Sequence, residues 1–446
     1  PNVVLIISDD QKYSDFGFMG HEAVQTPNLD RLARDAATYP NGYVPSSVCR
    51  PSLVTLLTGL YPHQHGVHFN HPPPGFAKLT KSPEIGKAEF DHKRERGAEL
   101  ITLVPTLPRL MAAQGYRCFQ TGKYWEGHWR NAGFTEGMTI AEPSGGPYGD
   151  KQLANGEWVA HGNGDHGLAI GRQTMQPIED FLDDVEQTPF LLWYAPFLPH
   201  TPHDSPQRFF DLYSADERVA KHEIPYFAAI SQFDDTVGQL MDSIARRGLT
   251  DNTLFVFVVD NGWEPDVERY VAHRQEWDHT KQSKRSPFDA GLRTPILLSW
   301  QGVIQRGTHL APVSSVDLVP TILSATTLTV PNAKFPGRDL WASATGAKTL
   351  SDQVPIFGEL YPGDASVLRE PARDVAYRWI RQGHHKLIVP RRSGGSAPWN
   401  GYLMAPALYD VVEDPNERIN RISDPALATI TRTLTTTLDR WWSPDR

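Results

Sequence analysis

The chain has 446 residues, with 43 Lys and Arg against 52 Asp and Glu, so its formal net charge is -9 at pH 7. This acidic balance gives no basic surface for nucleic acid, and no apolar run approaches the ~18 residues that a membrane-spanning helix needs. The length fits two domains, or one large α/β core with a smaller appendage. Cys49 and Cys118 are too few for a disulfide framework.

The first predicted strand is the apolar run 3–7, which is typical of a strand buried on both faces of a parallel sheet. Asp9 and Asp10 follow it, at the sheet edge where open α/β folds bind ligands. A single aspartate there would more simply start a turn. Because the chain opens on this strand, we expect a signal peptide to be absent or already removed; removal would favour a periplasmic or secreted location.

A crossover helix is predicted over 26–36, and a second, short helix follows Cys49. Pro51 suits the first turn of this second helix, and Gly59 suits its C-terminal end. Cys49 would then lie at the positive end of the helix, where free N–H groups stabilise a thiolate or a bound oxyanion. The alternative is a small buried cysteine without chemistry.

The segment 61–99 carries many charged and imidazole groups but few apolar ones. Its histidines at 63, 65, 68 and 71 match no tetrahedral metal template, so we expect a polar, solvent-facing loop near the site. Residues 75–99 are rich in Lys, Arg and Glu, which predicts an exposed insertion.

Three further predicted strands also end in polar residues. They are 116–120 followed by Lys123, 190–194 followed by His200, and 253–259 followed by Asp260 and Asn261. Because the carboxyl ends of parallel strands share one sheet edge, we expect these side chains to meet Asp9 and Asp10. Three carboxylates and an amide oxygen select a hard cation, Ca²⁺ or Mg²⁺, over zinc. With Cys49 nearby, such a site would hold a tetrahedral oxyanion against the metal and attack it.

The pattern changes after about residue 335, where shorter apolar runs replace the crossover helices. These runs, at 354–357, 377–380 and 386–389, predict a small antiparallel sheet, and 427–441 predicts a last amphipathic helix. We therefore predict an α/β protein with a mostly parallel central sheet. Its catalytic domain would span 1–335 and a smaller C-terminal α+β subdomain 336–446.

Several motifs together resemble the type I sulfatases of the alkaline-phosphatase superfamily, nearly end to end. They are Ser8-Asp9-Asp10, 26–33, Cys49-Arg50-Pro51-Ser52, 56–59, Thr121-Gly122-Lys123, 199–203, Asp260-Asn261-Gly262, 408–410 and Asp414-Pro415. The resemblance implies an alkaline-phosphatase-like αβα sandwich. It also implies a sulfohydrolase that cleaves a sulfate ester, or a sulfamate, on a small-molecule or oligosaccharide substrate.

The resemblance further implies that a formylglycine-generating enzyme converts Cys49 to formylglycine during maturation. One hydroxyl of the hydrated aldehyde would attack sulfur, and the other would then be deprotonated to release sulfate. The implied cofactor is Ca²⁺, with Mg²⁺ possible. Its implied ligands are Asp9, Asp10, Asp260, Asn261 and the modified Cys49.

Other roles follow from the same resemblance. Lys123, His200 and Lys284 would act beside Cys49, by binding the sulfate or assisting the leaving oxygen; Lys284 fits the family spacing better than Lys281. The expected substrate-binding residues are His203, Arg50 and His128.

Two positions depart from the family pattern. Leu53 stands where the motif Cys-x-Pro-x-Arg has arginine, and Trp125 stands where many members carry histidine, for which His128 is a candidate replacement. The departure at Leu53 leaves a catalytically silent binding homologue open. A phosphodiesterase or phosphonate monoester hydrolase of the superfamily is also open, since a metal and a helix N-terminus stabilise phosphate as readily as sulfate.

Overall fold

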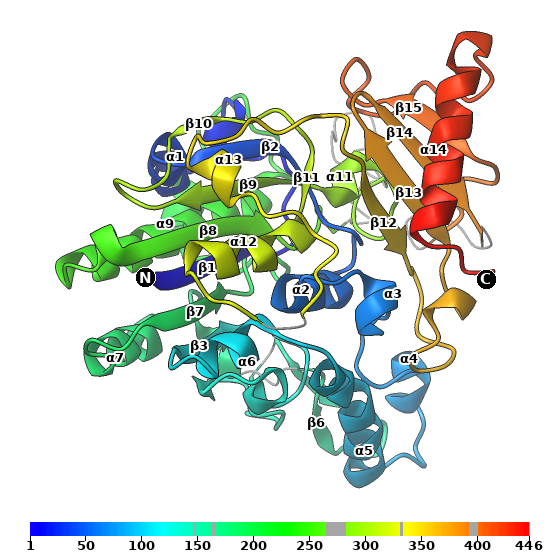
Figure 1. Cartoon of the computed structure of the whole chain (residues 1–446). Helices are drawn as coiled ribbons and strands as arrows, with labels where there is room; N and C mark the ends of the chain where they lie inside the picture. The colour runs from blue at the N-terminus through cyan, green and yellow to red at the C-terminus, as the bar shows by residue number, and fades with distance from the viewer. Residues whose placement is uncertain (147, 163–165, 265–281, 331–332, 392–399, 446) are drawn as a thin grey trace.

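A nine-stranded sheet forms the centre of the computed structural model, which describes residues 1–446 except 147, 163–165, 265–281, 331–332, 392–399 and 446 (Figure 1). Its strands are, in spatial order, β10 (Gly307–Thr308), β2 (Ala37–Tyr43), β9 (Arg293–Ser299), β8 (Thr253–Val259), β1 (Asn2–Ser8), β7 (Phe190–Ala195), β3 (Arg117–Gly122) and β4 (Glu136–Gly137), with β11 (Val313–Ser314) beside β2. From β8 to β4 all neighbours are parallel, whereas β9 is antiparallel to both β8 and β2. The predicted mostly parallel sheet is confirmed.

Helices cover both faces of this sheet, which explains why β1, β7 and β8 are buried along their whole length. Successive residues of β1 point to opposite faces, so that Val4 and Ile6 belong to one apolar cluster and Val3, Leu5 and Ile7 to the other. The first cluster includes residues of α1 (Pro27–Arg34), α7 (Gln176–Asp184) and α9 (Ile224–Arg246), and the second includes residues of α2 (Cys49–Thr58), α6 (Leu107–Ala112) and α12 (Leu318–Ala325). The predicted αβα sandwich is thereby confirmed.

The C-terminal part forms a second, four-stranded antiparallel sheet, seen at the orange end of Figure 1. Its strands are β12 (Ile356–Leu360), β13 (Tyr377–Gln382), β14 (His385–Pro390) and β15 (Ala407–Asp410). Helix α14 (Ala428–Trp441) buries Leu434 and Leu438 against one face of the sheet, while residues on the other face cluster with Tyr43 and Val48 of the central unit. The predicted small antiparallel sheet and terminal helix are confirmed. No helix in the described ranges has the length and apolar character that a bilayer crossing needs.

One prediction for the segment 61–99 is wrong and another holds only in part. Residues 75–99 are mostly exposed or half-buried, as predicted, but α4 (Phe76–Leu79) and α5 (Lys87–Ala98) also bury Phe76 and Phe90 against the hairpin of β5 (Asp150–Gln152) and β6 (Trp158–Ala160). The histidines between 63 and 71 do not form the predicted solvent-facing loop. His65 and His68 are 3% and 0% exposed, and the ring of His68 lies 2.9 Å from Asp374. The partners come from distant parts of the chain, which local composition does not show.

A buried ionic network joins the two sheets. Lys386 Nζ on β14 lies 2.7 Å from Asp289 Oδ1 and 3.0 Å from Glu417 Oε1, and Tyr43 donates to Asp289 Oδ2 at 2.5 Å. Burial raises the pKa of Glu417 to about 7. The positive charge of Lys386 opposes this rise in pKa only in part, and repulsion from Asp289 adds to the rise. Asp289 begins α11 (Asp289–Leu292), so this network anchors the segment that leads from Lys284 into β9.

Replacing Lys386 with Met should lower the free energy of unfolding by about 3–5 kcal/mol, because two carboxylates then stay buried without their cation. Denaturant unfolding followed by tryptophan fluorescence measures this, since Trp379 packs beneath the Lys386 ammonium at 5.7 Å. Lys348→Met, at an exposed lysine, is the control and should change stability by less than about 0.5 kcal/mol. Equal effects of the two substitutions would contradict the role of the network.

Candidate active site

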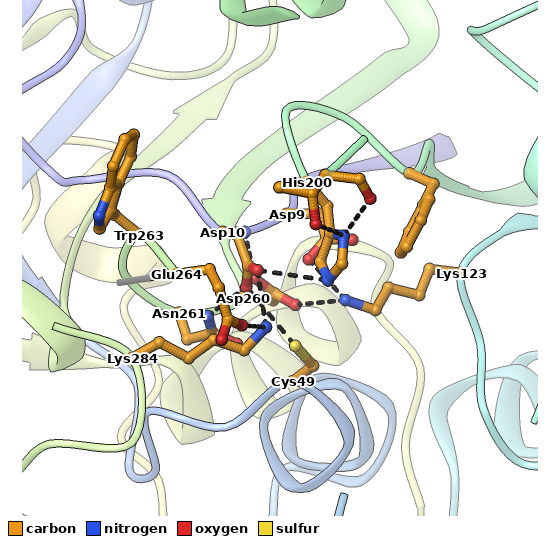
Figure 2. Close-up of polar contacts among 12 residues, drawn as sticks. Asp9, Asp10, Cys49, Lys123, His200, Asp260, Asn261, Trp263, Glu264 and Lys284 are labelled. Atoms are coloured by element: carbon orange, nitrogen blue, oxygen red, sulfur yellow. Dashed lines mark hydrogen bonds and ion pairs between the residues drawn. The ribbon is translucent and has the colours of Figure 1, made fainter. Parts of the chain in front are cut away.

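The polar residues that follow β1, β3, β7 and β8 meet at one edge of the central sheet (Figure 2). They are Asp9 and Asp10 after β1, Lys123 after β3, His200 after β7, and Asp260 and Asn261 after β8. Backbone contacts fix this edge: Asp9 N–H donates to the Leu198 carbonyl at 3.0 Å, and Asp10 N–H donates to Asp260 Oδ1 at 3.0 Å. The parallel register of neighbouring strands brings residues far apart in sequence into direct contact.

Cys49 enters this cluster from the first turn of α2. All ten residues of α2 are buried, and Gly59, with φ of 66°, ends the helix in the left-handed region. Cys49 Sγ lies 3.5 Å from Asp10 Oδ1. Burial raises the pKa of the Cys49 thiol well above its ordinary value, and the Asp10 charge raises it further. Burial and the Asp10 charge therefore oppose the stabilisation of a thiolate that the sequence predicted for the helix N-terminus.

The oxygen atoms of the cluster fit a hard cation. One ligand atom each from Asp9, Asp10, Asp260 and Cys49 lie within 4.8 Å of one another, and all four residues are buried. Asp9 Oδ2 and Asn261 Oδ1 are buried without a hydrogen-bond partner. Burial raises the pKa of Asp9 and of Asp260, and the neighbouring carboxylates add to this while Lys123 opposes it. Orphaned oxygens among repelling carboxylates are what a divalent cation would satisfy.

Two buried lysines flank these carboxylates. Lys123 Nζ lies 2.5 Å from Asp9 Oδ1 and 3.5 Å from Asp260 Oδ2, and Lys284 Nζ lies 2.6 Å from Asp10 Oδ2. Burial alone would lower the pKa of each ammonium, but the carboxylates raise it, so both lysines stay charged. Lys281, the alternative to Lys284, lies outside the described residues.

Glu264 is a member of the site that the sequence analysis missed. Its carboxylate lies 2.7 Å from Lys284 Nζ and 2.5 Å from Arg285 Nη1. Although burial would raise the pKa of Glu264, Lys284 and Arg285 lower it to about 2. The only sequence signal was its place three residues after Asn261, just past the end of β8.

His200 faces the cluster as a neutral imidazole. Its Nδ1 lies 2.6 Å from the Thr201 carbonyl, which can only accept, so Nδ1 carries the proton. Nε2, 3.4 Å from Asp10 Oδ2, therefore has the free lone pair. Burial lowers the pKa of His200 to about 3, although Asp10 opposes the shift. The ring stacks on Phe197 with centroids 4.1 Å apart, which holds Nε2 toward the carboxylates.

The three residues expected to bind substrate have other partners. Arg50 is fully buried, and its Nε and Nη2 donate to Glu126 at 2.6 and 2.8 Å. His128 accepts the N–H of Arg130 at 3.2 Å. His203 packs 5.7 Å, ring to ring, from Tyr226. Their roles as substrate contacts remain predictions, and the structure gives Arg50 a structural partner instead.

Leu53 occupies the position of the expected motif arginine, one turn after Cys49. It is 0% exposed and belongs to the apolar cluster on that face of the sheet. The described cations that contact the carboxylates around Cys49 are thus Lys123 and Lys284.

Arg50→Met should lower the free energy of unfolding by about 3–5 kcal/mol, because Glu126 is left as a buried, unpaired carboxylate. The double variant Arg50→Met/Glu126→Met should recover much of that loss, since no charge is then stranded. Denaturant titrations of the single and double variants measure the difference. A stable Arg50→Met protein whose only defect is a raised KM would instead establish Arg50 as a substrate contact.

Comparison with known proteins identifies the family of the chain. The family model described as Sulfatase matches residues 1–328. Human arylsulfatase A is 28% identical over 96% of this chain and 85% of its own length, and human N-acetylgalactosamine-6-sulfatase is 26% identical over 94% and 81%. A Bacteroides thetaiotaomicron structure from work on glycosaminoglycan metabolism shares the fold, with a TM-score of 0.74, 19% identity, and coverage of 100% of this chain and 99% of that one. The chain belongs to the sulfatase family and is a sulfuric ester hydrolase.

Proposed function

We propose that this sulfatase hydrolyses a sulfate ester on a carbohydrate, with Cys49 matured to formylglycine and Ca²⁺ as its metal. The proposal rests on one observation. Cys49 Sγ and one oxygen from each of three carboxylates lie within 4.8 Å of one another, and two buried lysines flank them. Asp9, Asp10, Asp260, Asn261 and the matured Cys49 would hold the cation. An oxygen-dominated ligand set favours Ca²⁺, and Mg²⁺ is the alternative with the same preference.

The charge of the site supports a metal for an anionic substrate. When ionised, four carboxylates face three cations and leave one negative charge, which would repel a sulfate ester. The members are Asp9, Asp10, Asp260 and Glu264 against Lys123, Lys284 and Arg285. Asp9, Asp10, Asp260 and Asn261 would hold a divalent cation that would reverse this sign and supply Lewis-acid polarisation of a sulfate oxygen.

The state of Cys49 supports its maturation. Its raised thiol pKa keeps the sulfur protonated, and a protonated thiol is a poor nucleophile. Formylglycine supplies a hydrated aldehyde, with one hydroxyl to attack sulfur and a second through which sulfate can be released. A formylglycine-generating enzyme is accordingly the proposed maturation partner.

The other side chains have distinct tasks. His200 Nε2, with its free lone pair, can accept a hydrogen bond from a hydroxyl of the substrate or of the matured nucleophile, because Nδ1 is already committed to the Thr201 carbonyl. Lys123 and Lys284 remain charged and can donate hydrogen bonds to sulfate oxygens or to the leaving oxygen as negative charge develops there. Glu264 positions Lys284 through its 2.7 Å ion pair.

A carbohydrate substrate is supported by the relatives. One is named for removing sulfate from N-acetylgalactosamine, at 26% identity over nearly the whole chain. The 12 tryptophans of this chain are compatible with sugar binding.

The reaction is tested with matched esters. The matured protein should release 4-nitrophenol from 4-nitrophenyl sulfate at a higher kcat/KM than from 4-nitrophenyl phosphate. Cys49→Ala should lose at least about 10³-fold in kcat with the sulfate, because the nucleophile is gone. Preference for the phosphate would favour the phosphoester hydrolase, and an active Cys49→Ala protein would refute the nucleophile.

The metal assignment is tested by Asp260→Ala. This variant should lose bound metal and turnover together while keeping its circular dichroism spectrum, because one ligand of the organising cation is removed. Elemental analysis by mass spectrometry gives the metal content per chain and identifies Ca²⁺ or Mg²⁺. Asp251→Ala, at an exposed position in the turn before β8, is the matched control and should keep the metal. Wild-type metal content in Asp260→Ala would refute the ligand set.

A further inference from the structure

Two histidines from separate parts of the chain meet beside the active site. His71 Nδ1 lies 2.5 Å from His161 Nε2, and the two rings are 4.6 Å apart. Phe76 packs on both rings, with centroids 4.6 Å from His71 and 4.4 Å from His161. Both histidines are half-buried.

Contacts place this pair between the nucleophile helix and Lys123. On one side Asn70, next to His71, accepts the backbone N–H of Arg50 in the first turn of α2 at 3.4 Å. On the other side the ring of Trp125 is 4.9 Å from His161, and Lys123 Nζ lies 5.8 Å from that same ring. The pair therefore borders the catalytic groups without belonging to the carboxylate cluster.

Both imidazoles are neutral. Burial lowers the pKa of His71 to about 4, and the nearby charges of Arg285 and Lys284 act in the same direction. Burial also lowers the pKa of His161 well below its usual range, and His71, Lys151, Lys123 and His200 add to this.

The hydrogen bond between the two neutral imidazoles determines whether each outer ring nitrogen is a donor or an acceptor. One ring nitrogen donates its N–H and the other accepts it, so of the outer nitrogens, His71 Nε2 and His161 Nδ1, one carries a proton and the other a lone pair. Switching the tautomer of both rings exchanges these roles. Neither outer nitrogen has a hydrogen-bond partner among the residues that the structure describes.

We propose that the His71–His161 pair binds a hydroxyl group of the sugar next to the sulfate ester, and so determines the substrate specificity of the enzyme. A sugar hydroxyl both donates and accepts, which matches one donor and one acceptor, whereas a sulfate group only accepts. A metal at the pair is not indicated, since no third ligand atom joins it within the described ranges. The inference rests on the proposed sulfatase function and adds a subsite for the carbohydrate part of the substrate.

The test replaces each histidine with phenylalanine, which keeps the ring packing on Phe76 and removes the ring nitrogens. His71→Phe and His161→Phe should each lower kcat/KM for galactose 6-sulfate about 10-fold or more, and the double variant should lose little beyond either, because the pair acts as a unit. 4-Nitrophenyl sulfate has no sugar hydroxyl for the pair to bind, so the turnover of this ester by each variant should stay within about 2-fold of that by the unchanged enzyme. His92→Phe, at an exposed histidine of α5, is the control.

His161→Gln keeps a donor and an acceptor, so it should recover part of the galactose 6-sulfate activity even if the phenylalanine variants fold poorly. Equal losses for the two esters would overturn the proposal, because the pair would then act on the sulfate or on the fold. An unchanged kcat/KM for galactose 6-sulfate would overturn it as well.

A binding measurement separates this proposal from the reaction itself. If the unchanged protein hydrolyses neither ester, the proposed function fails, but calorimetric binding of galactose 6-sulfate and of inorganic sulfate still tests the pair. His161→Phe should weaken binding of the sugar sulfate about 10-fold and leave inorganic sulfate binding unchanged. Equal affinity of variant and unchanged protein for galactose 6-sulfate would overturn the pair's role.

Discussion

The structure depends most on the burial of three carboxylates, those of Asp9, Asp10 and Asp260, at one edge of the central sheet. Desolvating charges costs several kcal/mol for each ion unless partners compensate. Lys123 and Lys284 supply part of that compensation through ion pairs of 2.5 and 2.6 Å. The remaining negative charge makes a place for a cation, and together with burial, the larger influence, it raises the pKa of the neighbouring Cys49 thiol. The proposed metal and the proposed maturation of Cys49 are both consistent with these buried charges.

The second sheet contributes to this site from a distance. The Pro45 carbonyl, four residues before Cys49, accepts from Glu359 N–H at 3.1 Å and from Trp379 Nε1 at 3.2 Å. The buried network around Lys386 anchors Asp289, five residues after Lys284. Strands of the C-terminal sheet therefore hold the segment that leads to Cys49 and the segment that carries Lys284. The small sheet thus supports both segments, although the carboxylate cluster of the described residues draws no residue from it.

Much of this arrangement could be predicted from the sequence because its signals are local. The apolar runs of β1, β7 and β8 indicate strands buried on both faces, and the polar residues after them must meet where parallel strands end. The resemblance to sulfatases added the role of Cys49, which composition alone left open. Cys49 itself was placed correctly at a helix start, but its raised pKa comes from burial and from Asp10, 39 residues away, which the sequence does not show.

The wrong prediction for His68, the buried partner of Arg50 and the missed residue Glu264 share a physical cause. Arg50 pairs with Glu126, 76 positions away in the sequence, and His68 pairs with Asp374, 306 positions away. Glu264 belongs to the site only because the fold brings it into an ion pair with Lys284. Side chains of these types are usually solvated, so a single sequence gives no reason to expect their burial. Long-range ion pairing decides such positions, and it becomes visible only once the fold is known.

The central claim is that Cys49 works as formylglycine although Leu53 replaces the motif arginine. Mass spectrometry of the peptide containing Cys49, from protein produced together with a formylglycine-generating enzyme, tests this claim most directly. The account predicts that the thiol sulfur is lost and an aldehyde oxygen is found in its place. A Cys49 that remains a thiol in protein that still hydrolyses the sulfate ester would contradict the mechanism, and a thiol in inactive protein would identify a binding homologue.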